Sequence, residues 1–150
     1  MISLRVYVDT SVVGGCFDED FADESRALFE MARRGDAAIL VSDLLIEEVS
    51  RAPKRVQHVL TRLPAECVVR IERTEASFRL CQASLDASVV SRQSENDAHH
   101  VALATVARAD LIVSWNFRHI VHYDKIRLFN AVNLREGYPM IDIRSPRELV

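Results

Sequence analysis

Three carboxylates that are far apart in the sequence occupy positions where they could act together. Asp9 follows the apolar run at residues 4–8, Glu48 lies in the segment 42–49, and Asp97 opens the segment 94–108. Carboxylates gathered in one pocket repel one another by a few kcal/mol per close pair, so they must share protons or hold a cation. Because this set offers oxygen ligands without a His or Cys cluster, the expected ion is Mg²⁺ or Mn²⁺. Such an ion can activate water and neutralise a phosphodiester.

Each carboxylate also has a simpler explanation. The Asp9-Thr10-Ser11 run is an ordinary strand-end turn, and Asp97 is suited to the first turn of a helix, where the helix dipole favours a negative charge. Glu47 and Glu48 point about 100° apart on a helix, so at most one of them can face a pocket. Glu48 lies three and four residues after Leu45 and Leu44, which inclines it slightly toward their buried side.

The histidines and aromatic residues give weaker signals. His99 and His100 are adjacent and diverge on a helix, with no third ligand in helical register, so we favour structural roles over metal binding. Trp115 could stack on a base, but a packing role is favoured. A late segment could contact a phosphate backbone, although a solvated or partner-binding surface is the simpler interpretation; it contains His119, His122, Tyr123, Lys125 and Arg127.

The elements that must position these residues alternate along the chain. Strands are predicted at 4–8, 38–41, 66–71, 111–114 and 140–143, and helices at 20–34, 42–49, 54–62, 75–88, 94–108 and, less regularly, 117–134. Ser94 is expected to be an N-cap. Alternation predicts an α/β fold with a mostly parallel sheet of four or five strands and helices on both faces. Strand ends and helix starts converge at one edge of such a sheet, which would bring the carboxylates near Ser114 and Asn116.

Bulk properties indicate a globular protein. The 150 residues suit one domain, 1–150. The contents of 49% hydrophobic and 27% charged residues are ordinary for a soluble protein. A net charge of −3 provides no overall basic field, which is weak evidence against nucleic-acid binding because local patches decide it.

Cysteine usage and hydropathy point to the cytoplasm. Cys16, Cys67 and Cys81 are widely spaced and form no C-x-x-C pair, which favours reduced thiols and argues against a zinc site. No apolar run approaches the roughly 20 residues of a membrane span, and the first residues lead into a strand-like segment rather than a signal peptide. A soluble cytoplasmic location is therefore expected.

Four short segments, in this order, resemble the PIN domain family. They are 8–12, which contains Asp9; 42–49, which ends in Glu48-Val49; 97–104, which begins with Asp97-Ala98; and 111–116, which contains Ser114 and Asn116. The match extends over nearly the whole chain, and the order and spacing are more specific than any one segment. The resemblance is to the VapC-like toxin ribonucleases of type II toxin–antitoxin systems.

The resemblance implies a three-layer α/β/α sandwich and an Mg²⁺- or Mn²⁺-dependent endoribonuclease that hydrolyses RNA with metal-activated water. Asp9, Glu48 and Asp97 would be the catalytic, metal-holding residues. Thr10 or Ser11 would orient the first carboxylate, and Ser114 would shape the site or position water. The implied partners are an RNA substrate, a small antitoxin and a second copy of the chain in a homodimer, with no membrane.

One position departs from the family pattern. Many members carry an acidic residue where this chain has Asn116, and the loss of that charge should weaken divalent-ion binding, above all at a second metal. Two other functions therefore remain open. One is a catalytically impaired PIN-like module that binds RNA or a protein. The other, ranked last, is a phospho-acceptor or small-ligand domain. A phospho-acceptor would need an acidic neighbour beside Asp9 and a Lys after a late strand, whereas no acidic residue directly precedes Asp9 and Lys125 lies in a helical segment.

Overall fold

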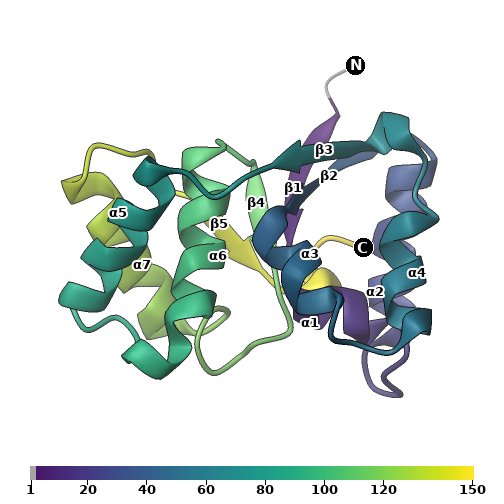
Figure 1. Ribbon diagram of the computed structural model, residues 1–150, viewed down its shortest axis with the longest axis horizontal. Coiled ribbons are helices and arrows are strands. Elements are labelled where there is room, and N and C mark those ends of the chain that lie inside the picture. The colour runs from purple at the N-terminus through teal and green to yellow at the C-terminus, as the bar shows by residue number, and fades with distance from the viewer. Residues whose placement is uncertain (1–2) are drawn as a thin grey trace.

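A five-stranded parallel sheet forms the centre of the molecule, as the computed structural model of residues 3–150 shows (Figure 1). The strand order is β3-β2-β1-β4-β5, and the strands are β1 (Leu4–Val8), β2 (Ala37–Ser42), β3 (Val68–Ile71), β4 (Leu111–Val113) and β5 (Asp142–Arg144). The helices are α1 (Thr10–Gly15), α2 (Ala22–Arg33), α3 (Asp43–Val49), α4 (Lys54–Thr61), α5 (Glu75–Asp86), α6 (Glu95–Val106) and α7 (Tyr123–Arg135). None of the helices in the described part of the chain has the length and apolar character to span a membrane.

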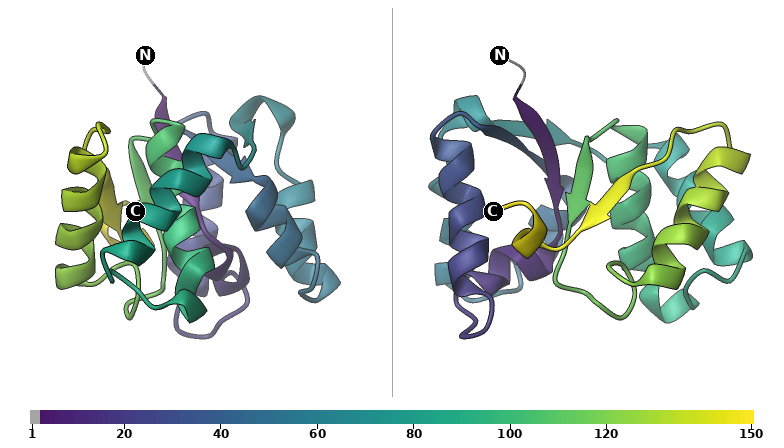
Figure 2. Two further views of the ribbon diagram at one scale, coloured as in Figure 1. Left: turned by 60° about the vertical axis from the view of Figure 1, so that its left-hand side comes forward. Right: turned by 180° about the vertical axis from the view of Figure 1, so that it is seen from behind.

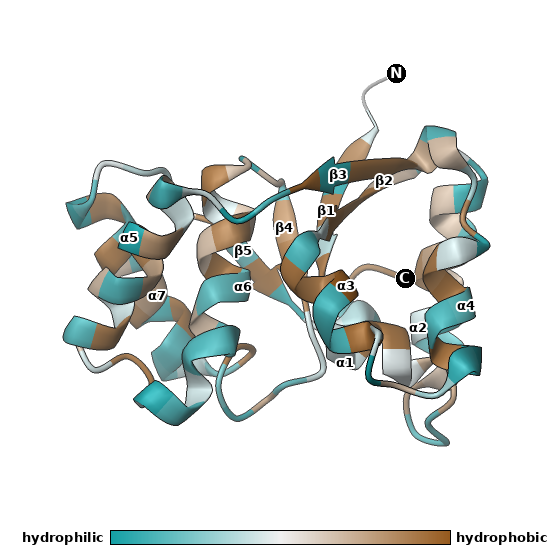
Figure 3. Cartoon of the chain, viewed as in Figure 1, coloured by the Kyte–Doolittle hydropathy of each residue, from teal (hydrophilic) through white to brown (hydrophobic). Residues whose placement is uncertain are grey.

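Alternation along the strands divides the core between the two faces of the sheet. Val6 and Val8 of β1 pack with α1 to α4, whereas Tyr7 between them packs with α5, α6 and α7. Since successive side chains on a strand point to opposite faces, a strand covered on both sides must be apolar throughout. The inner strands β2 and β4 are correspondingly hydrophobic along most of their length, whereas the edge strands β3 and β5 also carry hydrophilic residues (Figure 3). The result is the predicted three-layer α/β/α sandwich.

The register of the central strands builds the edge where the polar residues meet. Val8 pairs with Val113, so Asp9 and Ser114 leave neighbouring strands at the same level. Strand β1 has β2 on one side and β4 on the other, and the chain leaves β1 for the β2 side. This arrangement makes a switch point at the carboxyl ends of β1 and β4, where ligands bind in open α/β sheets.

Several predicted boundaries were wrong for local reasons. The third strand begins at Val68 rather than residue 66, because Ala65–Cys67 form a 3-10 turn after Pro64. The fifth strand is Asp142–Arg144, two residues later than predicted at its start, and is an edge strand beside β4 (Figure 2). Ser94 occupies the N-cap of α6 but its side chain makes no capping hydrogen bond.

The helix predicted over 117–134 starts only at Tyr123. The side-chain oxygen of Asn116 accepts the backbone N–H groups of Arg118 (3.2 Å) and His119 (2.9 Å), while its carbonyl oxygen accepts those of Ile120 and Val121. These bonds close a turn that occupies the first part of the predicted helix. Asn side chains favour such turns over helix interiors for this reason.

Candidate active site at the carboxyl edge of the sheet

Asp9 is the most rigidly held of the three carboxylates. It is 4% exposed and caps α1, with Oδ1 accepting from Val12 N (3.3 Å) and Ser11 Oγ (2.6 Å). Its other oxygen, Oδ2, accepts from Ser114 Oγ (2.6 Å). Hydrogen bonds to a charged acceptor are short and about twice as strong as neutral ones, so both oxygens of Asp9 have defined directions.

The two serines also join the strand ends that carry them. Ser11 Oγ accepts the backbone N–H of Trp115 (2.8 Å), and Ser114 Oγ accepts that of Asn116 (2.9 Å). The two hydroxyl oxygens lie 3.3 Å apart. Each serine therefore donates to Asp9 while it accepts from the backbone after β4, which couples the direction of Asp9 to the β1–β4 register.

Glu48 is half-buried and binds through one of its two oxygens. Oε1 accepts from Thr10 Oγ1 (2.7 Å) and lies 2.5 Å from His100 Nε2. Oε2 has only a long contact, 3.5 Å, with Asn96 Nδ2. Thr10 thus contacts Glu48, and the orientation of Asp9 that was expected of Thr10 or Ser11 is provided by Ser11.

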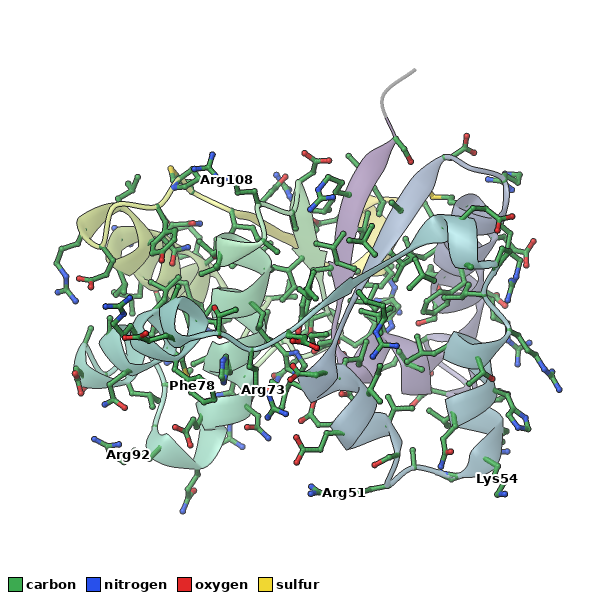
Figure 4. The ribbon with its side chains drawn as sticks, turned by 45° about the horizontal axis from the view of Figure 1, so that its top comes forward. Arg51, Lys54, Arg73, Phe78, Arg92 and Arg108 are labelled. Atoms are coloured by element: carbon green, nitrogen blue, oxygen red, sulfur yellow. The ribbon has the colours of Figure 1, made fainter. Side chains whose placement is uncertain are left out.

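Glu47 faces away from this group, in line with the expectation that only one of the two glutamates can face a pocket. It is exposed and accepts a hydrogen bond from Arg73 Nη2 at 2.7 Å, and the same arginine lies 3.3 Å from Asp43 Oδ1. Arg73, which is labelled in Figure 4, joins the segment before α5 to α3. Glu47 therefore forms a surface ion pair, while Glu48 belongs to the site.

Asp97 lies half-buried in the first turn of α6. Together with Glu48 it lines an open hollow of about 440 Å³, whose remaining wall is the segment from Arg92 to Asn96. Across residues 3–150, no three His, Cys, Asp or Glu side chains are grouped closely enough to hold one ion together. The three carboxylates thus belong to one edge of the sheet without forming a closed ligand set.

The pKa values of the three carboxylates are shifted by burial, by hydrogen bonds and by the charges of their neighbours. Burial raises the pKa of Asp97 above its ordinary range; His100 and His119 lower it, and the charges of Asp9 and Glu48 raise it further. Burial likewise raises the pKa of Asp9, against the opposing effects of His100 and its two serine hydrogen bonds. For Glu48 the hydrogen bonds from His100 and Thr10 outweigh burial, and its pKa is lowered.

His100 belongs to this site, although the sequence suggested only a structural role for it. It is 2% exposed, with Nδ1 2.6 Å from the hydroxyl of Tyr7 and Nε2 on Glu48. The one available signal was its spacing from Asp97, because residues three apart on a helix share a face. Its neighbour His99 has the expected structural role and contacts Ser77 and Phe78.

The remaining residues singled out from the sequence have local roles. The oxygen of Asn116 is engaged in its own turn rather than directed at the carboxylates. Trp115 is buried, stacks on Phe21 with centroids 4.2 Å apart and donates Nε1–H to Ser25, so it packs the core as expected. In the late segment, His122 caps α7 and Lys125 donates to the carbonyl of Val89.

Comparison with known proteins places this geometry in a family. No curated protein is significantly similar to the chain in sequence. Among solved structures, VapBC2 from Rickettsia felis, bound to a DNA fragment from its promoter, superposes with a TM-score of 0.60 at 12% identity, covering 95% of this chain and 98% of the other.

A second structure, VapC20 of Mycobacterium tuberculosis, described as a Sarcin-Ricin loop cleaving toxin, gives a TM-score of 0.52 at 14% identity. It covers 91% of this chain and 98% of the other. At identities this low, the two superpositions establish a shared fold and nothing beyond it. The sequence profile of the PIN domain matches residues 5–118, a range that contains every carboxylate described above, and the chain therefore belongs to the PIN domain family.

Proposed function

We propose that the chain is a divalent-cation-dependent endoribonuclease, the toxin of a toxin–antitoxin pair. The observation that carries the proposal is the convergence of Asp9, Glu48 and Asp97 at the switch point of the sheet. Membership of the PIN family and the shared fold with VapBC2 and VapC20 support it.

The donor chemistry at this edge fits Mg²⁺ or Mn²⁺. All three candidate ligands offer carboxylate oxygens, which these hard ions prefer. The like charges that raise the pKa of Asp97 are the charges that a bound cation would neutralise. Asp9, Glu48 and Asp97 would hold the ion after side-chain adjustment, because in the present arrangement they are not closely grouped.

The position of each residue indicates its role in the proposed reaction. A divalent ion held by Asp9, Glu48 and Asp97 would supply Lewis-acid stabilisation of the phosphodiester and would acidify water. Asp9 sets the direction of its oxygens through Ser11 and Ser114. Asp97 lies at the open hollow, which Arg92 also lines, and the guanidinium of Arg92 would pair with a substrate phosphate. Cleavage in this mode leaves a 3′-hydroxyl and a 5′-phosphate.

Cleavage of a mixed RNA pool tests the proposal. Purified protein is incubated with Mg²⁺, with Mn²⁺ and with chelator, beside Asp97→Asn and the control Asp23→Asn, an exposed aspartate in the first turn of α2. Cutting that requires a divalent ion, survives in Asp23→Asn and is lost in Asp97→Asn is the expected result. Equal background in all samples would contradict it.

An antitoxin is the proposed protein partner, and a groove between α2 and α4 is its proposed docking surface. The two helices present matched faces at i, i+3, i+4 and i+7, which frame a hollow of about 220 Å³; the faces are Arg26, Phe29, Glu30 and Arg33, and Arg55, His58, Val59 and Arg62. Glu30 is the one acidic residue among the lining residues. Such a surface suits an acidic amphipathic segment.

We further propose that the chain forms a homodimer. Four large apolar side chains on or near α7 are well exposed: Tyr123 at 73%, Leu128 at 44%, Leu134 at 56% and Met140 at 64%. The gathering of exposed apolar side chains on and beside one helix supports a protein contact there. Sedimentation equilibrium should give a dimer mass for the purified chain and a monomer mass for Leu134→Glu.

The proposed setting is the cytoplasm, with residues 1–150 as one domain. Cys16, Cys67 and Cys81 are buried free thiols, as expected where thiols stay reduced. The two core clusters lie on the two faces of one sheet, which supports a single folding unit.

The second candidate function is a PIN module that binds RNA without cutting it. It is favoured by Asn116, whose oxygen is engaged in a turn and adds no charge to the site. In the cleavage experiment this function predicts RNA retention that is independent of divalent ions and no new ends.

A further inference from the structure

We infer that His100 is a positioning residue that holds Glu48 by Oε1 and so leaves Oε2 as the oxygen that binds the cation. The inference rests on the proposed cation site and adds to it a residue outside the carboxylate set. It also assigns separate tasks to the two oxygens of Glu48.

A single hydrogen-bonded chain carries the inference. Ser42 Oγ accepts from Leu45 N (3.0 Å) and lies 2.8 Å from Tyr7 OH, which lies 2.6 Å from His100 Nδ1. His100 Nε2 lies 2.5 Å from Glu48 Oε1. An ionised carboxylate can only accept, so Nε2 must carry the proton. In a neutral imidazole Nδ1 then accepts from Tyr7, and Ser42 donates to Tyr7.

The series of hydrogen bonds from Ser42 to Glu48 connects the elements that carry the candidate ligands. Ser42 caps the start of α3, whose end carries Glu48. Tyr7 stands on β1, and His100 lies one turn after Asp97 on α6. Tyr7 is fully buried and His100 is 2% exposed, so packing holds both rings. This series of hydrogen bonds therefore fixes the distance between α3 and α6, and with it the separation of Glu48 from Asp97.

The two oxygens of Glu48 differ in their contacts. Oε1 accepts two hydrogen bonds, from Thr10 and His100, while Oε2 has only the 3.5 Å contact with Asn96. Glu48 and Asn96 both line the hollow that contains Asp97. A group that fixes one oxygen of a ligating carboxylate and orients the other raises metal affinity, and its removal typically costs about 10–100-fold.

Two amide substitutions at His100 separate its two contacts. In His100→Asn the side chain ends where Nδ1 stands and keeps an acceptor for Tyr7 without reaching Glu48. In His100→Gln the amide nitrogen extends toward the position of Nε2 and keeps a donor for Glu48. Both variants bury an amide in place of an imidazole, so their free energies of unfolding in chelator serve as the matched control for general destabilisation.

Isothermal titration of the full chain with Mn²⁺ measures the consequence without catalysis. We expect His100→Asn to weaken Mn²⁺ binding about 10–100-fold and His100→Gln by less than about threefold, at similar unfolding free energies. Equal weakening in both variants, or wild-type affinity in His100→Asn, would overturn the inference alone. A wild-type chain that binds no Mn²⁺ would overturn the proposed cation site and this inference with it.

The tautomer of His100 provides a readout that needs neither metal nor a folded His100 variant. Long-range ¹H–¹⁵N correlation spectra of the wild-type chain in chelator should show His100 protonated at Nε2. Tyr7→Phe, which removes the donor to Nδ1, should weaken that preference. Protonation at Nδ1 with Nε2 unprotonated in the wild type would overturn the inference, because Nε2 could not then donate to Glu48.

Discussion

Hydroxyl groups do much of the orienting work at the candidate site. Asp9 accepts one hydroxyl hydrogen bond from Ser11 and one from Ser114, and Glu48 accepts one from Thr10. A hydroxyl can donate to a carboxylate while it accepts from the backbone, as both serines do. The carboxylates are therefore directed by short side chains that the strand ends hold in place.

Ser114→Ala should weaken the site more than the fold. Ser114 is fully buried and its Oγ is the only side-chain donor to Asp9 Oδ2 in the described chain. We expect Mn²⁺ affinity or RNA cleavage to fall about 10–100-fold and the free energy of unfolding to fall by about 1–2 kcal/mol. Ser50→Ala, at an exposed serine whose Oγ donates to the carbonyl of Glu47, is the control. Unchanged Mn²⁺ affinity in Ser114→Ala would count against the role of Asp9.

His99 should make stability depend on pH. It is 4% exposed, lies 3.0 Å from Ser77 Oγ and packs edge-on against Phe78. Its pKa is lowered from 6.5 to about 4, chiefly by burial and in addition by Arg73 and His100, while Asp43 opposes the shift. A lowered pKa means that the unfolded chain binds the proton more readily, so the stabilisation is complete above pH 6.5 and is lost as the pH falls toward 4.

Urea unfolding in chelator between pH 4 and pH 8 checks this prediction. The shift corresponds to about 3 kcal/mol lost at the acid end, a contribution that His99→Gln should lack. The difference in unfolding free energy between the wild type and His99→Gln should therefore shrink as the pH is lowered. A difference that is constant across this range would show that His99 does not remain neutral in the folded chain.

Among the elements, α1 packs closely against its neighbours at Gly15. A Cβ on Gly15 would lie 2.6 Å from Ser25 Oγ and 2.8 Å from Trp115 Nε1, two atoms that are hydrogen-bonded to each other. Only a residue without a side chain lets α1 approach α2 and the end of β4 this closely. This approach places Thr10 and Ser11, at the start of the same helix, beside Glu48 and Asp9.

Two neighbouring glycines test the packing of α1. Gly15→Ala should lower the free energy of unfolding by about 1–3 kcal/mol, the usual range for overpacking. Gly14→Ala meets nothing within 4 Å and should raise it by up to about 1 kcal/mol, because Ala favours the helix. Urea denaturation of the two variants measures both effects. Equal changes would show that propensity, rather than close packing, governs this position.

On the scale of the whole molecule, local charge differs from the net charge. The chain is acidic overall, at −3, yet the groove between α2 and α4 gathers arginines. Arg26 and Arg55 lie over the ring of Phe17, 5.7 Å and 5.1 Å from its centroid. Two arginines seven residues apart on each helix stand about 10.5 Å apart along it, a spacing that acidic residues on a third helix would match.

Charge reversal in the groove should therefore weaken the antitoxin complex. Arg55→Glu combined with Arg62→Glu should reduce affinity about 10-fold or more, with a smaller dependence on salt. Arg79→Glu, on α5 and paired with Glu75 at 3.8 Å, is the control on another element. Calorimetric titration with the proposed antitoxin, at two NaCl concentrations, measures both effects. Equal losses in the groove variant and the control would place the antitoxin elsewhere.

The sequence alone determined the α/β class, the order of the elements along the chain and the positions of the three carboxylates at the ends of those elements. These features depend on hydropathic period and on hydrogen bonds between near neighbours, such as Asp9 capping α1 and Ser42 capping α3. Local signals were misleading over residues 117–122, where the side chain of Asn116 competes with the helix for backbone N–H groups.

Only the tertiary structure decided which side chains meet at the site. Thr10 and Glu48 are 38 residues apart, His100 and Glu48 are 52 apart, and Tyr7 and His100 are 93 apart. Such contacts depend on the register of β1 with β2 and β4 and on how α3 and α6 pack over the sheet. No window of neighbouring residues contains that information, because it arises from the packing of the whole core.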